Sequence, residues 1–257
     1  MKVLIKHEAD LIGDCLCAFP AILKKAESSE LSLWIRNKHV QSLFKAPSHL
    51  TLLLDEPSGA EVRKFDQVFS PNLSTVFFER HAKEHMIQTY FHLLELPIPQ
   101  DIPPPSVQFA PTSDRYDFLI SPYSYSGTLT KEWPLGNWYP ILDRLLKVGS
   151  VGILGSGQGL YKNPPCPFFQ SVSYVYDRPL PEVATLISRA RLVLTVDNGI
   201  SHLTHAVGAP HILLYPIILP VCWVQNPRNN VAMIREDPAR LNPDRVLNIL
   251  NFTLTRF

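Results

Sequence analysis

Residues 192–210 read LVLTVDNGISHLTHAVGAP and pass from a buried strand through a short polar turn into a helix. Residues 192–196 are apolar and rich in β-branched side chains, which predicts a strand. Residues 200–207 are predicted to form a helix that ends at Gly208, and residues 211–215 form another apolar run. A strand, a helix and a second strand in this order are typical of a parallel sheet, so the stretch predicts an α/β fold.

The same alternation extends along the whole chain. The first half is predicted to contain strands at 3–5, 31–35, 51–54 and 67–69, and helices at 14–26, 37–44 and 79–96. The second half is predicted to add strands at 116–120 and 151–154, and helices at 136–147, 180–190 and 243–250, the last capped by Asn242.

Residues 97–111 separate the two halves. They hold six prolines in fifteen positions and have no periodic apolar pattern, which is typical of a linker. We therefore place one domain at 1–110 and another at 111–257. Each is predicted to be Rossmann-like, with the two parallel sheets facing a central cleft. The ligand-binding loops should lie at the carboxyl ends of the strands.

The bulk composition narrows the class of partner. The chain has 24 Lys and Arg against 23 Asp and Glu, a formal charge of +1, which disfavours a general attraction to nucleic acid or anionic membrane. Four cysteines fit neither a disulfide framework nor a CxxC metal motif and favour a reducing compartment. No apolar stretch is long enough to cross a bilayer. We expect a cytoplasmic monomer without a transmembrane segment.

The turn after the strand at 192–196 carries the first candidate chemistry. A helix that starts near Gly199 leaves its first amides unpaired and is positive at that end, so a diphosphate can bind there without a metal. Asn198, Ser201 and His202 can donate side-chain hydrogen bonds. Local chemistry alone also allows a structural explanation of this turn, in which Asp197 is an N-cap, Gly199 is a turn residue and His202 lies on a helix face.

The loop after the predicted strand at 116–120 is rich in hydroxyl groups. Ser124, Ser126 and Thr128 suit phosphate oxygens, and Lys131 can neutralise charge that develops on a leaving diphosphate. The alternative is an exposed turn with a solvated lysine, followed by a buried helix entry at Trp133.

The loop after the first strand offers carboxylates. Asp14, at the start of a predicted helix, can act as a general base that removes the proton of an acceptor hydroxyl. It is also a good N-cap, which is the alternative explanation. Asp10 and Glu8 are nearby carboxylates that compete for the same role.

Three segments in a fixed order point to one family. They are the opening MKVLIKHEADLIGDCLCAFPAILKKA, the segment Lys131-Glu132-Trp133-Pro134 with Trp138, and residues 180–216, which carry Asp-x-Gly-x-x-His followed by Ala-x-x-x-Pro. Together they resemble the ADP-heptose lipopolysaccharide heptosyltransferases and their relatives, glycosyltransferase family 9, which have the GT-B fold.

The resemblance implies a role for each candidate residue. Asp14 takes the general-base position, and Lys131 contacts donor phosphate. Further donor-binding positions are Ser124, Ser126, Thr128, Asp197, Asn198, Gly199, Ser201 and His202. The positions implied on the acceptor side are Asp10, Gly13 and His85, with His85 and Tyr90 on the cleft side of their helix. No metal and no cofactor are implied besides a nucleotide-sugar co-substrate, with ADP as the candidate nucleotide.

The expected activity is a metal-independent, inverting transfer of a sugar, with heptose as a candidate, from a nucleotide diphosphate to an acceptor hydroxyl. The amino-terminal half is shorter than is usual in the family, which puts a lipopolysaccharide acceptor in doubt. One alternative is a nucleotide-sugar-binding protein that has lost catalysis. Another is a glycosyltransferase that acts on a nucleobase, a protein or a small metabolite.

Two weaker signals are set aside. Gly155, Gly157 and Gly159 suggest a dinucleotide fingerprint, but the third glycine is misplaced and prolines follow where a helix should begin. His81 and His85 are four residues apart on a predicted helix, as in some metal sites, yet no third ligand is evident.

Overall fold

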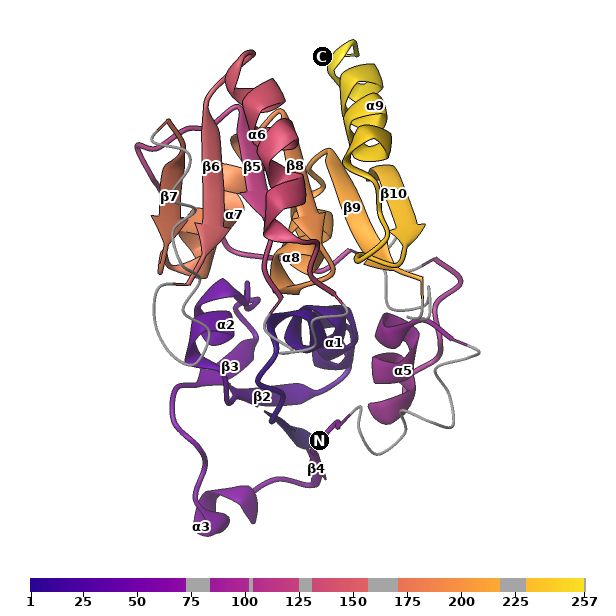
Figure 1. Cartoon of the computed structure of the whole chain (residues 1–257). Helices are drawn as coiled ribbons and strands as arrows, with labels where there is room; N and C mark the ends of the chain where they lie inside the picture. Colours follow the sequence, from indigo (N-terminus) through magenta and orange to yellow (C-terminus); the bar gives the residue numbers. More distant parts are fainter. Residues whose placement is uncertain (73–83, 102–103, 125–130, 157–170, 218–229, 257) are drawn as a thin grey trace. The chain divides into compact units, whose positions relative to one another are not determined.

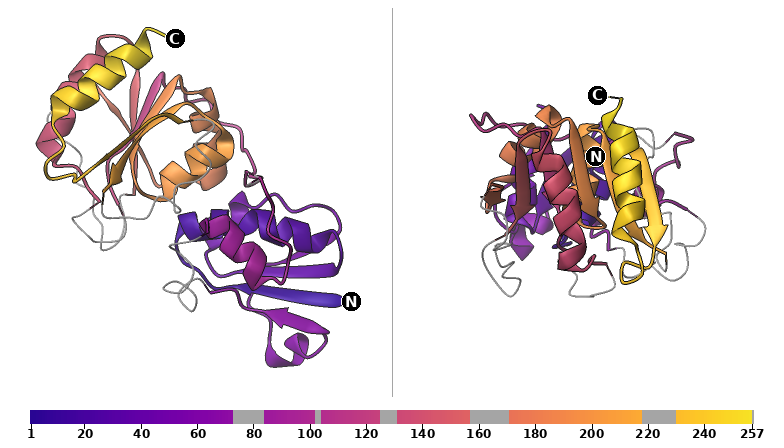
Figure 2. Two further views of the ribbon diagram at one scale, coloured as in Figure 1. Left: turned by 90° about the vertical axis from the view of Figure 1, so that its right-hand side faces the viewer. Right: turned by 45° about the horizontal axis from the view of Figure 1, so that its top comes forward.

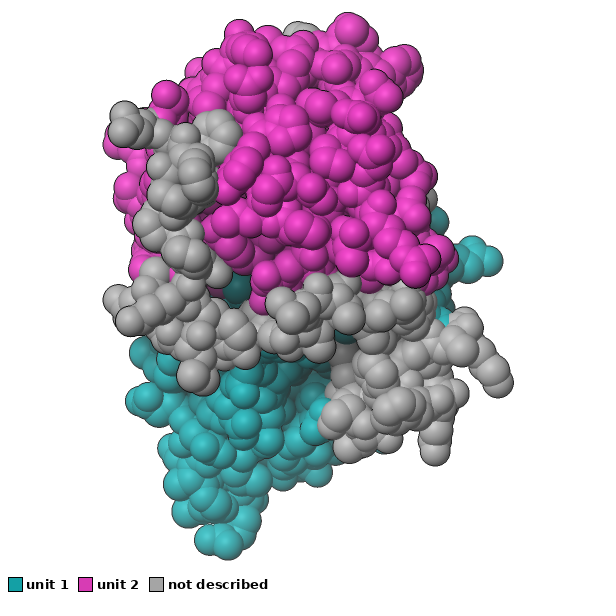
Figure 3. Space-filling model, in the orientation of Figure 1, with its two compact units in different colours: residues 1–108, 220–226 teal, residues 109–219, 227–257 magenta. Residues whose placement is uncertain are grey.

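The computed structural model describes residues 1–72, 84–101, 104–124, 131–156, 171–217 and 230–256. They form two compact units (Figure 3): unit 1 covers residues 1–108, and unit 2 covers the described residues from 109 onward. Each unit is built on a parallel sheet (Figure 1), which confirms the predicted α/β class. None of the described helices is long and apolar enough to cross a bilayer.

Unit 1 contains a four-stranded parallel sheet with the order β3-β2-β1-β4. The strands are β1 (Lys2–His7), β2 (Glu30–Ile35), β3 (Leu50–Leu53) and β4 (Gln67–Phe69). The helices are α1 (Ile12–Ala26), α2 (Lys38–Leu43), α3 (Gly59–Val62) and α5 (Met86–Leu93). α1 and α5 pack together on one face of this sheet (Figure 2, left). Because the strands are parallel, the loops after β1, β2 and β3 leave at one edge, the carboxyl edge of unit 1.

Unit 2 contains a six-stranded parallel sheet with the order β10-β9-β8-β5-β6-β7. The strands are β5 (Phe118–Ser121), β6 (Val151–Gly155), β7 (Ser173–Tyr176), β8 (Leu192–Val196), β9 (His211–Pro216) and β10 (Asn230–Glu236). β5 and β8 lie side by side at the centre of the sheet. β6 and then β7 follow outward from β5, and β9 and then β10 follow outward from β8 on the other side. This is the strand order of a Rossmann fold.

Helices cover both faces of the unit 2 sheet (Figure 2, left). A short 3₁₀ turn (Leu135–Asn137) leads into α6 (Trp138–Leu146), which packs with α9 (Pro243–Leu254) on one face. α7 (Leu180–Arg189) and α8 (Gly199–Val207) pack together on the other face. The apolar sides of α6 and α9 join the inward side chains of the strands in one core, so the sheet is a rigid platform for the loops at its edge.

Most predicted elements are confirmed, with shifted ends. The strands at 67–69 and 192–196 are found at the predicted residues, and Gly208 ends α8 with a left-handed φ of 81°. Sequence reasoning missed β7 and α3, which have four residues each, and β10, which begins and ends with polar residues.

The helix predicted at 14–26 begins earlier than expected. α1 starts at Ile12 with Leu11 in the N-cap position, where no side chain caps it. Asp14 is therefore the third helical residue, and the reading of Asp14 as an N-cap is wrong. A carboxylate in the first turn is still favoured there, because it faces the positive end of the helix dipole.

The helix predicted at 79–96 is shorter in its described part. α5 begins at Met86 because His85 caps it: the Nδ1 atom of His85 accepts the amide hydrogen of Ile87 at 3.1 Å. It ends at Leu93, since Glu95 takes a left-handed φ of 55° and Pro97 follows. His85 thus precedes the helix, and its predicted place along one side of that helix is wrong.

His7 is a fully buried polar residue at the end of β1. Its ring is 0% exposed and packs edge-on against Tyr90 with 5.6 Å between ring centroids, and neither ring nitrogen has a hydrogen-bond partner among the described residues. Burial lowers the pKa of His7 to about 4, so the side chain is neutral near pH 7.

This burial predicts an acid-sensitive fold. Between pH 6.5 and 4 the unfolded chain protonates His7 while the folded chain does not. The free energy of unfolding is therefore not reduced by His7 above pH 6.5, and it falls by up to about 3 kcal/mol towards pH 4. We expect His7→Leu to remove that part of the pH dependence, because it replaces two unsatisfied nitrogens by apolar atoms. Urea unfolding of both proteins from pH 4.5 to 7.5 checks this, and equal pH slopes would contradict it.

Candidate functional site

The central point of the unit 2 sheet is where β5 and β8 lie side by side. Ser121 at the end of β5 pairs with Thr195 of β8, and the chain leaves these two strands towards opposite sides of the sheet. In open α/β sheets, ligands bind outside the carboxyl ends of the strands at such a switch point. The loops at 121–131 and 197–199, which the sequence singled out, both start here.

Asn198 joins these two loops. It is the N-cap of α8, and its Oδ1 atom accepts the amide hydrogen of Ser201 at 3.0 Å. Its Nδ2 atom donates to the Tyr123 carbonyl at 2.7 Å and to the Ser121 hydroxyl at 2.9 Å. Ser201 is 3% exposed and donates its hydroxyl to the Asn198 carbonyl at 2.7 Å. Both side chains therefore stabilise the start of α8, and their predicted contact with donor phosphate stays a prediction.

The start of α8 has backbone amides at the position where the sequence predicts anion binding. Within the described chain, the Asn198 cap accepts the amide hydrogen of Ser201, whereas the amides of Gly199 and Ile200 have no hydrogen-bond partner. Both residues are partly exposed, as is His202 in the first turn. Two amides at the positive end of a nine-residue helix can bind a phosphate group.

We expect Asn198→Ala to destabilise unit 2 by about 2 kcal/mol. The cap contributes about 1 kcal/mol, and the lost bonds to the β5 loop add a similar amount. The matched control is Asn242→Ala in α9, where Asn242 only caps the Asp244 amide at 2.9 Å, and about 1 kcal/mol is expected. Denaturant unfolding compares the two variants. An equal loss would show that the bonds to Ser121 and Tyr123 contribute nothing.

Lys131 and Asp197 form an ion pair at the same switch point. The Lys131 Nζ atom lies 2.7 Å from the Asp197 Oδ2 atom, and the two side chains are 20% and 6% exposed. The pair connects the end of the β5 loop to the residue just before the α8 cap. It brings together two predicted site residues that are 66 positions apart in the sequence, and it places a cation next to the start of α8.

Glu132 is a site residue that sequence reasoning missed. Its Oε1 atom accepts the amide hydrogen of Ser124 at 2.8 Å, which ties the two ends of the β5 loop together. Ser124 and Glu132 are eight positions apart in the sequence, so no local pattern indicates the contact. Ser126 and Thr128 lie in the same loop but outside the described residues.

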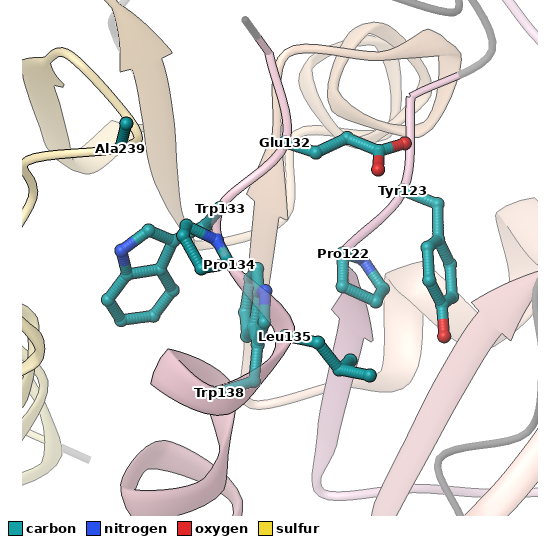
Figure 4. Close-up of a pocket in the computed structure, with 8 residues that line it drawn as sticks. All are labelled: Pro122, Tyr123, Glu132, Trp133, Pro134, Leu135, Trp138 and Ala239. Carbon is teal, nitrogen blue, oxygen red and sulfur yellow. The ribbon is translucent and has the colours of Figure 1, made fainter. Parts of the chain in front are cut away.

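The helix entry after Lys131 is held by two tryptophans. Trp133 packs edge-on against Trp138 with 5.1 Å between ring centroids, and its Nε1 atom donates to the Leu241 carbonyl at 2.9 Å. Both are almost fully buried. A mostly apolar pocket of about 420 Å³ opens beside them (Figure 4). It is lined by Pro122, Tyr123, Glu132, Trp133, Pro134, Leu135, Trp138 and Ala239.

The residues predicted on the acceptor side lie at the carboxyl edge of unit 1, except for His85. Gly13 and Asp14 are in the first turn of α1, directly after the loop that holds the exposed Asp10. Asn37, the N-cap of α2, donates its Nδ2 hydrogen to the Asp10 carbonyl at 2.5 Å and fixes this loop. His85 instead caps α5, as described above.

No metal cluster is found in the part of the chain that the structure describes. That part holds no group of three or more His, Cys, Asp and Glu side chains placed to bind an ion. His81, the first residue of the spaced histidine pair, lies outside it.

A Rossmann-type sheet with a helix start and a lysine at its switch point is an arrangement that nucleotide-binding α/β proteins use. The family model of glycosyltransferase family 9 (heptosyltransferase) matches residues 59–236. The chain belongs to this family, which confirms the resemblance read from the three loops.

Individual proteins and solved structures are also similar to this chain. Lipopolysaccharide heptosyltransferase 1 of Salmonella typhimurium is 34% identical over 91 residues, which are 33% of this chain and only 28% of that protein. ADP-heptose lps heptosyltransferase II of E. coli has a TM-score of 0.71 at 15% identity, over 100% of this chain and 99% of that one. The iron-containing dodecameric glycosyltransferase TibC of enterotoxigenic E. coli H10407 has a TM-score of 0.64 at 18% identity, over 85% of this chain and 59% of that one. These likenesses confirm the GT-B fold.

Proposed function

We propose that this protein is a glycosyltransferase that moves a sugar from a nucleotide diphosphate to an acceptor hydroxyl. The observation that supports it most is the Lys131–Asp197 pair beside the capped start of α8, at the switch point of a Rossmann-type sheet. A diphosphate bound there would meet two backbone amides and one ammonium group.

On the donor side, the bond between the sugar and the diphosphate breaks, and negative charge develops on the departing phosphate oxygen. Lys131 would stabilise this charge together with the amides of Gly199 and Ile200, since fixed positive groups lower the barrier where charge develops. Asp197 would hold the lysine in place, as it does in the structure at 2.7 Å.

On the acceptor side, Asp14 would accept the proton of the attacking hydroxyl. The acceptor oxygen then bonds to the anomeric carbon from the face opposite the departing diphosphate, so the configuration inverts. The first turn of α1 supports Asp14 as the base because it presents the carboxylate at the carboxyl edge of unit 1.

The donor and the metal requirement are also part of the proposal. One structural relative is named for ADP-heptose, which favours ADP-heptose as the donor to test first. Lys131 and the positive end of α8 supply the charge that a metal often supplies, which supports a metal-independent reaction. Because TibC is iron-containing, the purified protein should be assayed before and after chelation. A loss of turnover that iron restores would contradict metal independence.

The deciding experiment is a panel of nucleotide sugars. We expect at least one to raise the unfolding temperature and to release its nucleoside diphosphate when an acceptor is added. Binding without turnover across a broad acceptor screen would favour the binding-protein alternative. Absence of binding by every nucleotide sugar would refute the proposed function.

A further inference from the structure

Two buried histidines meet where α8 ends and β9 begins. His205 is in the last turn of α8, His211 is the first residue of β9, and they are 6% and 0% exposed. Their Nε2 atoms lie 3.2 Å apart, and the rings meet edge-on with 4.2 Å between centroids. The proposed reaction uses neither residue, so the close approach of these two titratable rings needs its own explanation.

The other nitrogen of each ring faces a backbone carbonyl. His205 Nδ1 lies 2.8 Å from the Ser201 carbonyl oxygen, and His211 Nδ1 lies 3.0 Å from the Ala209 carbonyl oxygen. A carbonyl oxygen only accepts hydrogen bonds, so both Nδ1 atoms carry hydrogen. If both rings were neutral, both Nε2 atoms would be bare, and their lone pairs would face each other at 3.2 Å.

One additional proton between the two Nε2 atoms removes this conflict. Two neutral rings could avoid it only by moving a hydrogen from Nδ1 to Nε2, which would set a bare nitrogen against a carbonyl oxygen and lose a buried hydrogen bond. An imidazolium beside a neutral imidazole keeps all three bonds, and bonds from a charged donor are the stronger ones. The last turn of α8 also favours positive charge on His205, because it is the negative end of the helix dipole.

We propose that His205 and His211 share one proton, and that this charged pair clamps the end of α8 to the start of β9. The bond from His205 to the Ser201 carbonyl extends the clamp towards the start of the helix. There, the amide and the hydroxyl of Ser201 both bond to Asn198. The inference does not depend on the proposed function, because it concerns the stability of unit 2.

The charged residues on the neighbouring elements have partners of their own. α7 and β8 pack against α8, and β8 and β10 flank β9. β8 has no charged residue, and the charged residues of the other two are Glu182 and Arg189 on α7 and Arg235 and Glu236 on β10. The two glutamates pair with Arg178 and Arg245, and the two arginines donate to the carbonyls of Thr112 and Ile217. The other titratable side chains on α8 and β9 are His202 and Tyr215.

A metal ion could also bridge two bare Nε2 atoms, but the described residues favour a proton. A structural metal site usually has four protein ligands. In the described chain no third His, Cys, Asp or Glu side chain joins this pair to form such a group.

The test is the folding equilibrium constant between about pH 7.5 and 8.5, measured by urea unfolding of the full chain. The unfolded chain holds almost no proton on its histidines there, because their ordinary pKa is about 6.5, whereas the folded pair holds one. Folding therefore weakens as the pH rises. We expect the folding constant to fall about tenfold more over this range in the unaltered protein than in His211→Gln. The glutamine amide can still donate to His205 but brings no charge.

His39→Gln is the matched control. His39 is an exposed histidine of α2, so this variant should keep the pH dependence of the unaltered protein. An equal pH dependence in His211→Gln and the unaltered protein would overturn the proposal.

Nitrogen NMR of the unaltered, histidine-labelled chain gives a second readout that needs no variant. At about pH 8 we expect one proton shared by the two Nε2 atoms, and two fully bare Nε2 atoms would overturn the proposal. A chelator should change neither result. A loss of stability on chelation that zinc restores in the unaltered protein but not in His211→Gln would show that a metal bridges the pair, which would also overturn it.

Discussion

Asp14→Asn is expected to lower kcat by about 10²–10⁴, because general-base catalysis contributes factors of that size. The amide keeps the size and most of the polarity of the carboxylate but cannot accept the proton of the acceptor. Affinity for the nucleotide sugar should stay nearly the same, since the donor groups are on unit 2 and Asp14 is on unit 1. Initial rates with saturating acceptor, together with donor binding by calorimetry, measure the two effects separately.

The matched control for this variant is Glu27→Gln. Glu27 follows the last turn of α1, is exposed and pairs with Lys24, so its neutralisation tests for a general effect of charge on the helix. It should leave kcat unchanged. Asp10→Asn tests the competing carboxylate in the preceding loop. If Asp14→Asn retained full activity while Asp10→Asn lost it, the base would have to be reassigned to Asp10.

The fold, and the meeting of Lys131 and Asp197 at one edge of the unit 2 sheet, were largely predictable from the sequence. Alternating strands and helices fix a parallel sheet, and parallel strands bring their carboxyl-end loops to one edge. That is why Lys131 and Asp197 could be assigned to one site from sequence, and the ion pair of 2.7 Å agrees with this.

Other features depend on packing that leaves no local pattern. The Asn198 side chain caps α8 and holds Ser121 and Tyr123, a structural role that the sequence reading of Asn198 as a hydrogen-bond donor to phosphate did not include. The serine three positions later was the available signal, since that spacing is typical of a capping box. The burial of His7 was not predictable, because it depends on α5, which is far along the chain.

Lys131→Met is expected to reduce both stability and catalysis. Removing the lysine leaves the Asp197 carboxylate buried without its partner, which should cost about 3 kcal/mol in the free energy of unfolding. It also removes the charge that, in the proposed mechanism, stabilises the departing diphosphate, so kcat/KM should fall by about 10²–10³. Lys147→Met is the control in the same unit. Lys147 forms an exposed pair with Asp143 at 2.6 Å, and its loss should cost less than about 1 kcal/mol.

A double variant separates the two roles of Lys131. In Lys131→Met with Asp197→Asn the buried charge is removed along with its partner, so stability should return to within about 1 kcal/mol of the unaltered protein. Turnover should stay low, because the cation near the start of α8 is still missing. Recovery of both stability and turnover would mean that Lys131 only holds Asp197 in place. Recovery of stability alone is the outcome that assigns the lysine to the chemistry.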